Sequence, residues 1–173
     1  MAAAVFLDRD GVINRAVVRD GKPYAPSSIA DVEILPGVTE ALTALRAAGF
    51  ALVVVTNQPD VARGTQSQAA VDAIHRHLSE TLPIDEIRVC YHDDKDHCAC
   101  RKPKPGLLTT PATYDMWQSV MVGDRWRDIE AGYRAGVKAT ILIDYHYDEP
   151  MPVEPDLRVG SLADAARWIL ENT

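Results

Sequence analysis

The sequence predicts an α/β fold of three layers, with helices on both faces of a mostly parallel sheet. Short runs of consecutive apolar residues, typical of strands buried on both faces, alternate with segments of helical periodicity along the 173 residues. Such alternation favours parallel crossover units over hairpins. Because no repeat, low-complexity tract or linker interrupts it, we expect a single domain over residues 1–173.

The expected strands are the uninterrupted apolar runs. FALVVV at 50–55 is the strongest of them, and a last, weak strand is expected near 157–159. The full set of expected strands covers residues 2–7, 50–55, 87–91, 120–122, 139–143 and 157–159.

Each expected helix carries a start or stop signal of its own. Gly49 stops the first helix, since the position after a helix often has a left-handed backbone that favours glycine. Ser67 caps the second helix and Pro83 ends it. Gly136 stops the third, and Ser161 caps the last. The helices between these signals are expected over residues 38–48, 68–82, 127–135 and 162–169.

Two long stretches, residues 14–35 and 92–104, break this rhythm. Long non-periodic segments inside a compact domain are more often functional loops than accidents. We therefore expect both to be loops that serve the site. Neither is long enough for a separately packed cap domain, so the site should be capless and open.

The composition excludes several classes of protein. Eighteen Lys and Arg against 25 Asp and Glu give a net charge of −7, which disfavours a nucleic-acid binder because phosphate neutralisation needs clustered cations. The start, MAAAVFLDRDGVI, lacks the basic and apolar parts of a signal peptide, and no run approaches the ~20 apolar residues of a membrane span. We expect a cytoplasmic monomer that acts on a small molecule, with no nucleic-acid or membrane partner.

Polar side chains follow three of the expected strands. Asp8 and Asp10 follow the first, Thr56 ends the second and Asp124 follows the fourth. In a sheet ordered 3-2-1-4-5 these strands are neighbours, and ligands bind beyond the carboxyl ends near the switch in strand order. We expect the four residues to converge on one crevice, with both carboxylates of the first strand on one face if that strand continues.

Three carboxylates in one crevice repel each other unless a cation neutralises them, and Mg²⁺ is the natural candidate. One carboxylate can attack phosphorus to form an aspartyl-phosphate, while a second protonates the leaving oxygen and then activates water. Arg101, Lys102 and Lys104 supply cations for the transferring phosphoryl group. Singly, these residues also fit helix caps, turns and solvated charges; in this order at strand ends they favour phosphoryl transfer.

Four ordered motifs resemble those of the haloacid dehalogenase superfamily of phosphatases. They are FLDRDGVIN at 6–14, VVVTNQ at 53–58, RKPKPG at 101–106 and MVGDRWRDIEAG at 121–132. The closest branch is that of the D-glycero-D-manno-heptose 1,7-bisphosphate phosphatases, with histidinol-phosphate phosphatases as near relatives. The resemblance implies a Rossmann-like, capless fold of the haloacid dehalogenase type. It also implies an Mg²⁺-dependent phosphomonoester hydrolase that acts on a phosphorylated sugar and removes its 7-phosphate.

The resemblance implies roles for individual residues. Asp8 would be the nucleophile and an Mg²⁺ ligand, and Asp124 would be a second ligand. Asp10 would be the general acid and base, and its backbone carbonyl would also bind Mg²⁺. Thr56 and Lys102 would hold the transferring phosphoryl group. The residues expected to contact the substrate are Arg9, Tyr24, Asn57, Gln58 and Arg101, with Arg19 and Lys22 as weaker candidates.

All three cysteines lie in the pattern Cys90-x-His92-x₅-Cys98-x-Cys100. An odd number excludes a wholly intramolecular disulfide framework. Three sulfurs and one imidazole form a set typical of structural Zn²⁺, and free thiols in a reducing cytosol are the alternative. The resembled branch carries a zinc loop at this place, which favours zinc. Bound zinc would order residues 92–104, which have almost no apolar residues of their own.

Several neighbouring residues are left out of these sets. His97 breaks the paired spacing of the metal ligands, and we expect Asp93, Asp94 and Asp96 to be solvated. Asp128 is expected either as an acid behind the site or as the residue that starts the next helix.

The chain departs from the branch pattern at three places. Pro59-Asp60 follows TNQ where Ser-Gly is usual, Arg125 stands where lysine is common, and the loop 15–24 is longer. These departures concern the substrate, so hydrolysis of histidinol phosphate is an alternative. An alternative of another class is a non-catalytic, zinc-stabilised binding protein, against which the intact set of catalytic residues argues. The acidic charge disfavours a DNA 3′-phosphatase.

Overall fold

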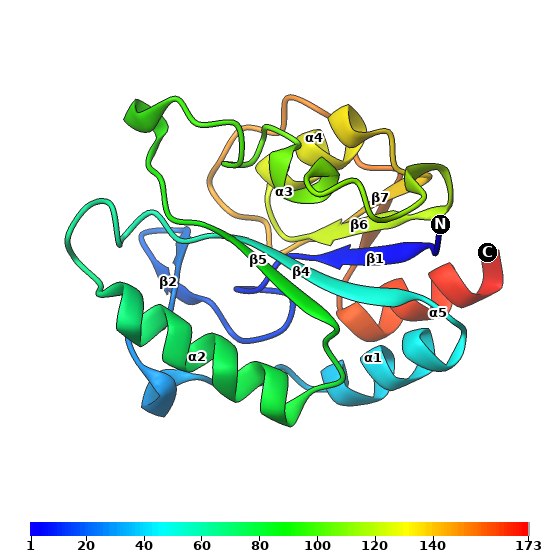
Figure 1. Cartoon of the computed structure of the whole chain (residues 1–173), viewed down its shortest axis with the longest axis horizontal. Helices are drawn as coiled ribbons and strands as arrows, with labels where there is room; N and C mark the ends of the chain where they lie inside the picture. The colour runs from blue at the N-terminus through cyan, green and yellow to red at the C-terminus, as the bar shows by residue number, and fades with distance from the viewer. Residues whose placement is uncertain (173) are drawn as a thin grey trace.

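A computed structural model describes residues 1–172, and its centre is a parallel sheet (Figure 1). The sheet has six strands in the order β5-β4-β1-β6-β7-β8, and each neighbouring pair is parallel. This order confirms the predicted one and adds the weak last strand at the edge. The strands are β1 (Ala4–Leu7), β4 (Ala51–Asn57), β5 (Glu86–Cys90), β6 (Val120–Gly123), β7 (Ala139–Ile143) and β8 (Leu157–Val159).

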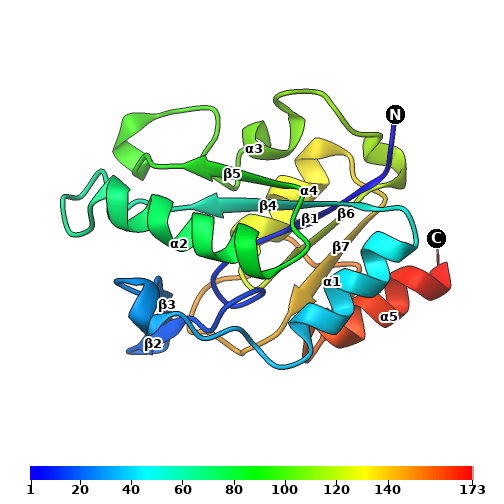
Figure 2. The same ribbon diagram turned by 60° about the horizontal axis from the view of Figure 1, so that its bottom comes forward.

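Helices cover both faces of this sheet (Figures 1 and 2). One face carries α1 (Val38–Ala47), α2 (Gln68–Thr81) and α5 (Leu162–Asn172), of which α1 and α5 lie side by side. The other face carries the short α3 (Gly106–Thr109) and α4 (Trp126–Ala135). Within residues 1–172, no helix is long and apolar enough to cross a membrane.

The central strand β1 shows how two cores form on the two faces of one sheet. Successive side chains of a strand point to opposite faces. Val5 and Leu7 belong to the core under α1, α2 and α5, whereas Ala4 and Phe6 belong to the core under α3 and α4. All four side chains are fully buried, which is why the run contains no polar residue.

The predicted helix signals act as expected. The Ser67 Oγ accepts a hydrogen bond from the Ala70 amide at 3.1 Å, and the Ser161 Oγ accepts one from the Asp164 amide at 3.2 Å. Gly136 has a left-handed backbone at the end of α4, and Gly49 has one just after α1. These residues thus mark where the helices begin or end.

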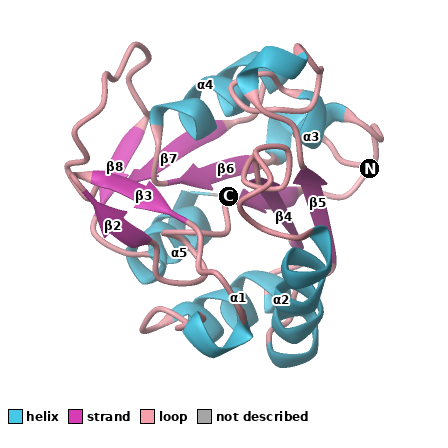
Figure 3. Cartoon of the chain, turned by 90° about the vertical axis from the view of Figure 1, so that its left-hand side faces the viewer, coloured by secondary structure: helices cyan, strands magenta, loops and turns pink. Residues whose placement is uncertain are grey.

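The stretch 14–35, expected as a loop, contains a small hairpin that forms a separate two-stranded sheet (β2 and β3 in Figure 3). Its antiparallel strands are β2 (Val17–Arg19) and β3 (Lys22–Tyr24). Asp20 and Gly21 join them with φ angles of 50° and 72°. Two left-handed residues in sequence define the tight turn that Asp-Gly favours, so this dipeptide is the signal of a hairpin that the expectation of a loop missed. A 3₁₀ turn, η1 (Ile29–Asp31), follows it.

Candidate active site

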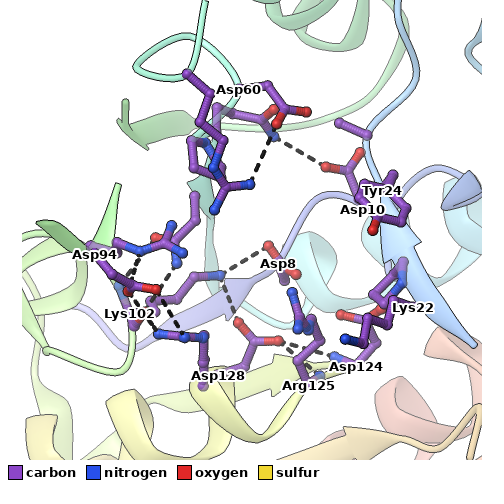
Figure 4. A pocket seen from close by; sticks show the side chains of 18 residues that line it. Asp8, Asp10, Lys22, Tyr24, Asp60, Asp94, Lys102, Asp124, Arg125 and Asp128 are labelled. Atoms are coloured by element: carbon purple, nitrogen blue, oxygen red, sulfur yellow. Dashed lines mark hydrogen bonds and ion pairs between the residues drawn. The ribbon is translucent and has the colours of Figure 1, made fainter. Parts of the chain in front are cut away.

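A buried lysine bridges two carboxylates at the carboxyl ends of β1 and β6 (Figure 4). The Lys102 Nζ donates to Asp8 Oδ1 at 2.9 Å, to Asp128 Oδ1 at 2.6 Å and to the Val55 carbonyl at 2.7 Å. Asp124 completes the group, since ligand oxygens of the three aspartates lie within 4.8 Å of one another. Asp8 and Asp124 therefore meet in one place, as the strand order predicts, and the loop after β5 brings Lys102 to them.

Asp128 has both of the roles that the sequence left open. Its Oδ2 accepts from the amides of Asp124 at 3.2 Å and Arg125 at 3.1 Å, at the start of α4. A carboxylate is stabilised at a helix N-terminus by unpaired amides and the helix dipole. The approach is close enough that a Cβ on Gly123 would lie 2.1 Å from the Asp128 Cβ, so this position requires glycine. The other oxygen of Asp128 remains for Lys102.

Burial, followed by the charge of Asp128, raises the pKa of Asp8 to about 6 against the opposing effect of Lys102. Burial and Asp8 also hold the pKa of Asp124 well above its usual range. Burial alone would lower the pKa of Lys102, but Asp128 and Asp8 outweigh it and raise that pKa. Within this buried cluster, the Lys102 ammonium is thus set against the three carboxyl groups of Asp8, Asp124 and Asp128.

Asp124 carries the clearest sign that a cation fits here. Its Oδ1 is buried and has no hydrogen-bond partner among residues 1–172, while its Oδ2 accepts from the Tyr147 hydroxyl at 2.8 Å. A buried carboxylate oxygen without a partner is costly unless a cation or a proton satisfies it. Two carboxylates with raised pKa values and an unsatisfied oxygen fit a divalent ion with oxygen ligands.

Tyr147 is a site residue that the sequence did not reveal. It lies in the segment after β7, next to Tyr145, whose hydroxyl donates to the Gly11 carbonyl at 2.8 Å. The two rings stack with centroids 5.5 Å apart. The amide of Asp148 donates to the Gly21 carbonyl, which ties this segment to the β2-β3 hairpin. No spacing or motif in the segment pointed to this contact.

Asp10 lines the pocket but lies apart from the three clustered aspartates (Figure 4). Asp8 and Asp10 would share a strand face only if the strand continued, but β1 ends at Leu7 and the chain then turns. The Asp10 carboxylate accepts from Gln58 Nε2 at 3.1 Å and Asn14 Nδ2 at 3.0 Å.

Arg9, expected to contact the substrate, is fully buried and is not among the residues that line the pocket. Its guanidinium instead donates to Asp10 Oδ1 and Oδ2 and faces His75.

The three polar residues at the end of β4 have different positions. Thr56 is 1% exposed and its Oγ1 accepts from Gln58 Nε2 at 2.9 Å, so the hydroxyl lies behind the pocket wall. Asn57 brackets the backbone of Lys102: its Nδ2 donates to the Lys102 carbonyl, and its Oδ1 accepts from the Lys102 amide, both at 3.1 Å. This pair of hydrogen bonds places Lys102 relative to the sheet.

The pocket is a cavity of about 260 Å³ above these residues. Tyr24 and Lys22 reach it from β3, and Pro59 and Asp60, which depart from the branch pattern, also line it. Cations are prominent in the lining. They are Lys22, Arg63, Arg101, Lys102, Arg125 and Arg127. The sequence predicted Lys22, Arg101 and Lys102 at the site, but it assigned no site role to Arg63, Arg125 and Arg127.

Three sulfurs and one imidazole gather beside the pocket. His92 Nδ1 lies 3.5 Å from Cys90 Sγ and 3.3 Å from Cys100 Sγ, and Cys98 Sγ lies 3.7 Å and 3.6 Å from the same two sulfurs. Metal bonds of about 2.3 Å to sulfur and 2.0–2.1 Å to nitrogen imply tetrahedral edges of about 3.6–3.8 Å. The Cys90–Cys100 pair, at 2.6 Å, is closer than that. The cluster therefore has the donors, and most of the spacing, of a tetrahedral metal site.

Two of the acidic residues beside this metal cluster form ion pairs that the sequence did not reveal, although Asp94 and Asp96 are exposed, as expected. Asp93 forms an ion pair with Arg63 at 2.9 Å. Asp94 pairs with Arg101 at 2.8 Å and with Arg127 at 3.3 Å. All three arginines line the pocket, so the loop that holds the cysteines also holds the cations of the site.

The raised pKa values make a prediction for the magnesium-free protein. A folded state that raises a carboxyl pKa gains stability below the unfolded value and loses it as the pH rises through the folded value. We expect Asp124→Asn to melt about 5 °C above wild type at pH 7.5 without Mg²⁺, with a smaller gap at pH 5. Comparing the two proteins cancels titrating groups that lie away from Asp124, among them His75. A gap that is constant or reversed would contradict the prediction, which thermal unfolding by circular dichroism tests.

The fold and this site define a class of protein. A model of the HAD-hydrolase-like family matches residues 99–165, which include Lys102, Asp124 and Asp128. The chain is a phosphatase of this superfamily. The D-glycero-alpha-D-manno-heptose-1,7-bisphosphate 7-phosphatase of Mycobacterium bovis is 42% identical over 78% of the chain and 74% of its own length. The beta-anomer enzyme of Escherichia coli K12 is 34% identical over 98% and 88%. The chain belongs to the family of D-glycero-D-manno-heptose 1,7-bisphosphate phosphatases.

Solved structures agree with this assignment. The D,D-heptose 1,7-bisphosphate phosphatase of B. bronchiseptica, complexed with magnesium and phosphate, superposes with a TM-score of 0.80. It is 31% identical, and the match covers 99% of both chains. A HAD-like phosphatase from Mesorhizobium loti superposes with a TM-score of 0.76 at 30% identity, over 97% of this chain and 86% of its own.

Proposed function

We propose that this chain removes the 7-phosphate of D-glycero-D-manno-heptose 1,7-bisphosphate through an aspartyl-phosphate on Asp8. The observation that carries the proposal is the Lys102 ammonium held between Asp8 and Asp128, beside the unsatisfied oxygen of Asp124. The relatives named above act on this substrate according to their names. The geometry of the site thus supports the proposed chemistry, and the names of the relatives support the proposed substrate.

The proposed reaction has two displacements at phosphorus. First, an oxygen of Asp8 bonds to phosphorus, the bond to the leaving oxygen breaks, and Asp10 gives its proton to that oxygen. Water then bonds to phosphorus and passes a proton to Asp10, while the bond to Asp8 breaks and releases inorganic phosphate. Lys102 neutralises charge on the transferring group, for which its buried position is suited because the low dielectric strengthens the attraction.

Magnesium is the proposed cofactor, held by Asp8, by Asp124 and by the backbone carbonyl of Asp10. The bound ion would supply charge that draws the phosphate oxygens toward the nucleophile. Asp124 is prepared for this role, since Tyr147 holds one of its oxygens and leaves the other without a partner. The crystal structure of the B. bronchiseptica relative contains magnesium.

The pocket cations suit a substrate with two phosphates. Lys102 is buried at the floor with Asp8, while Arg101 and Arg127 approach from the side of the cysteine loop. Arginine binds phosphate through a planar pair of donors. We propose that Lys102 meets the phosphate that is removed and that the arginines meet the one that remains.

A comparison of substrates tests the proposed function. We expect kcat/KM for heptose 1,7-bisphosphate to exceed that for histidinol phosphate and fructose 1,6-bisphosphate by about 100-fold, because sites built for a substrate's polar groups reject analogues that lack them. Both anomers of the heptose should be measured. Phosphorus NMR should show loss of the 7-phosphate. A preference for histidinol phosphate would overturn the assignment of substrate.

The metal at Cys90, His92, Cys98 and Cys100 is proposed to be a structural Zn²⁺. Cys98 also accepts a hydrogen bond from the Arg101 amide at 3.4 Å, so the cluster and the pocket arginine are directly linked. Metal binding would order a loop that has little apolar surface. An ordered loop would hold Asp94 in place, and the ion pairs of Asp94 would then fix the side chains of Arg101 and Arg127.

Replacing one sulfur ligand tests this role. We expect Cys98→Ser to lose zinc stoichiometry and to raise KM about 10-fold, with a smaller change in kcat, because the pocket arginines lose their support while the Asp8 cluster stays. Ala99→Ser is the control, since it places the same side chain on an exposed neighbouring residue. Metal analysis and steady-state kinetics measure both. Full zinc content and wild-type KM in Cys98→Ser would refute the role.

A further inference from the structure

We propose that Arg9 is a positioning residue that orients Asp10, and that His75 in turn holds Arg9. This inference rests on the proposed function, because it takes Asp10 as the acid that protonates the leaving oxygen. Resemblance to the family led us to expect Arg9 at the substrate, but the structure directs its guanidinium away from the pocket.

The guanidinium of Arg9 is fully enclosed between Asp10 and His75. Its Nε and Nη2 lie 3.1 Å and 3.0 Å from Asp10 Oδ1, and Nη2 also lies 3.2 Å from Oδ2. A planar guanidinium that holds both oxygens of a carboxylate restricts its rotation as well as its position. Burying a guanidinium is strongly unfavourable unless it is well paired, so the Arg9 side chain depends on its partners to stay in this position.

His75 occupies the opposite edge of the guanidinium. It lies on α2, is buried, and its Nε2 is 2.8 Å from Arg9 Nη1. Because a guanidinium can only donate, Nε2 accepts, and the imidazole is neutral. Burial, followed by the charge of Arg9, lowers the pKa of His75 to about 4, against the opposing effects of Asp10 and Asp72. The imidazole therefore stays an acceptor at neutral pH.

The surroundings leave Asp10 one open direction. Asn14 donates to Oδ1 and Gln58 donates to Oδ2, while the buried guanidinium of Arg9 donates from the side away from the pocket. The side chain is 16% exposed and lines the pocket, so its exposed edge is the part that a substrate can reach. A general acid works only within hydrogen-bond reach of the atom it protonates, and small misplacements cost up to about 100-fold in rate.

Two substrates that differ in their need for an acid test the inference. The leaving group of heptose 1,7-bisphosphate is a sugar alkoxide, which requires protonation. The leaving group of p-nitrophenyl phosphate is a stable phenolate, which does not. The ratio kcat/KM reports on the steps up to release of the leaving group. For Arg9→Met we expect a loss of about 100-fold with the heptose and at most about 3-fold with the nitrophenyl ester. An equal loss with both substrates, or a loss that lies only in KM, would overturn the inference.

Two variants of His75 give an answer even if Arg9→Met does not fold. His75→Leu removes the acceptor and should lower kcat/KM for the heptose about 10-fold more than for the nitrophenyl ester. His75→Gln retains an acceptor oxygen and should recover most of that loss. If His75→Leu lacks this selectivity, or if His75→Gln is equally impaired, the inference is wrong.

Asp10→Asn, measured with the same two substrates, separates this inference from the proposed function. Selectivity in Asp10→Asn without selectivity in the Arg9 or His75 variants would overturn only the inference. If Asp10→Asn itself shows no selectivity, the acid role of Asp10 is wrong and the inference falls with it.

Discussion

Asp8→Asn is expected to lower kcat for phosphate release by about 10⁴-fold or more, because the amide cannot form the aspartyl-phosphate. The fold should remain intact. An amide oxygen still accepts the hydrogen bond that Lys102 Nζ donates to Oδ1 at 2.9 Å. It also removes one negative charge from a buried group of three, so the magnesium-free variant should melt at or above the wild-type temperature at pH 7.5.

The measurement is turnover of p-nitrophenyl phosphate and of heptose 1,7-bisphosphate with Mg²⁺, beside thermal unfolding. Asp31→Asn is the matched control, since Asp31 is exposed on η1 and the substitution makes the same change of charge. Activity of Asp8→Asn within tenfold of wild type would remove Asp8 as nucleophile. A folded variant with no turnover would leave the assignment in place.

Much of the fold was predictable because parallel strands buried on both faces carry apolar runs without interruption. The four fully buried valine and leucine residues at 52–55 are an example, and they predict β4 without reference to any partner. Once the strands are ordered, their carboxyl ends bring Asp8 and Asp124 to one edge. This part of the site follows from topology.

The rest of the site depends on turns and side-chain pairing, which apolar periodicity does not describe. The turn after Leu7 moves Asp10 away from Asp8 and sends Arg9 inward. Asp93 and Asp94 look like solvated acids until the partner arginines, distant in sequence, are placed beside them. Tyr147 reaches Asp124 from a segment with no motif. Each of these contacts joins segments whose proximity only the folded chain reveals.

Lys102→Met should lower kcat about 10³-fold and also destabilise the protein, because this one ammonium serves both the reaction and the charge balance of the core. It is 2% exposed and neutralises Asp8 and Asp128 at 2.9 Å and 2.6 Å. Removing one partner of a buried ion pair costs about 3–5 kcal/mol, or about 10 °C in melting temperature for a chain of this size. Lys102 also lowers the pKa of Asp8, so its loss should move the acid limb of the activity profile to higher pH.

A second substitution separates the two roles of Lys102. Asp128→Asn in the Lys102→Met background removes the carboxylate that the lost ammonium had neutralised, so it should recover a large part of the melting temperature. It should not recover kcat, because no cation then meets the transferring phosphoryl group. Steady-state kinetics and thermal unfolding of both variants measure this. If the double variant regained activity together with stability, Lys102 would act only through the fold; recovery of stability alone assigns the ammonium to the chemistry.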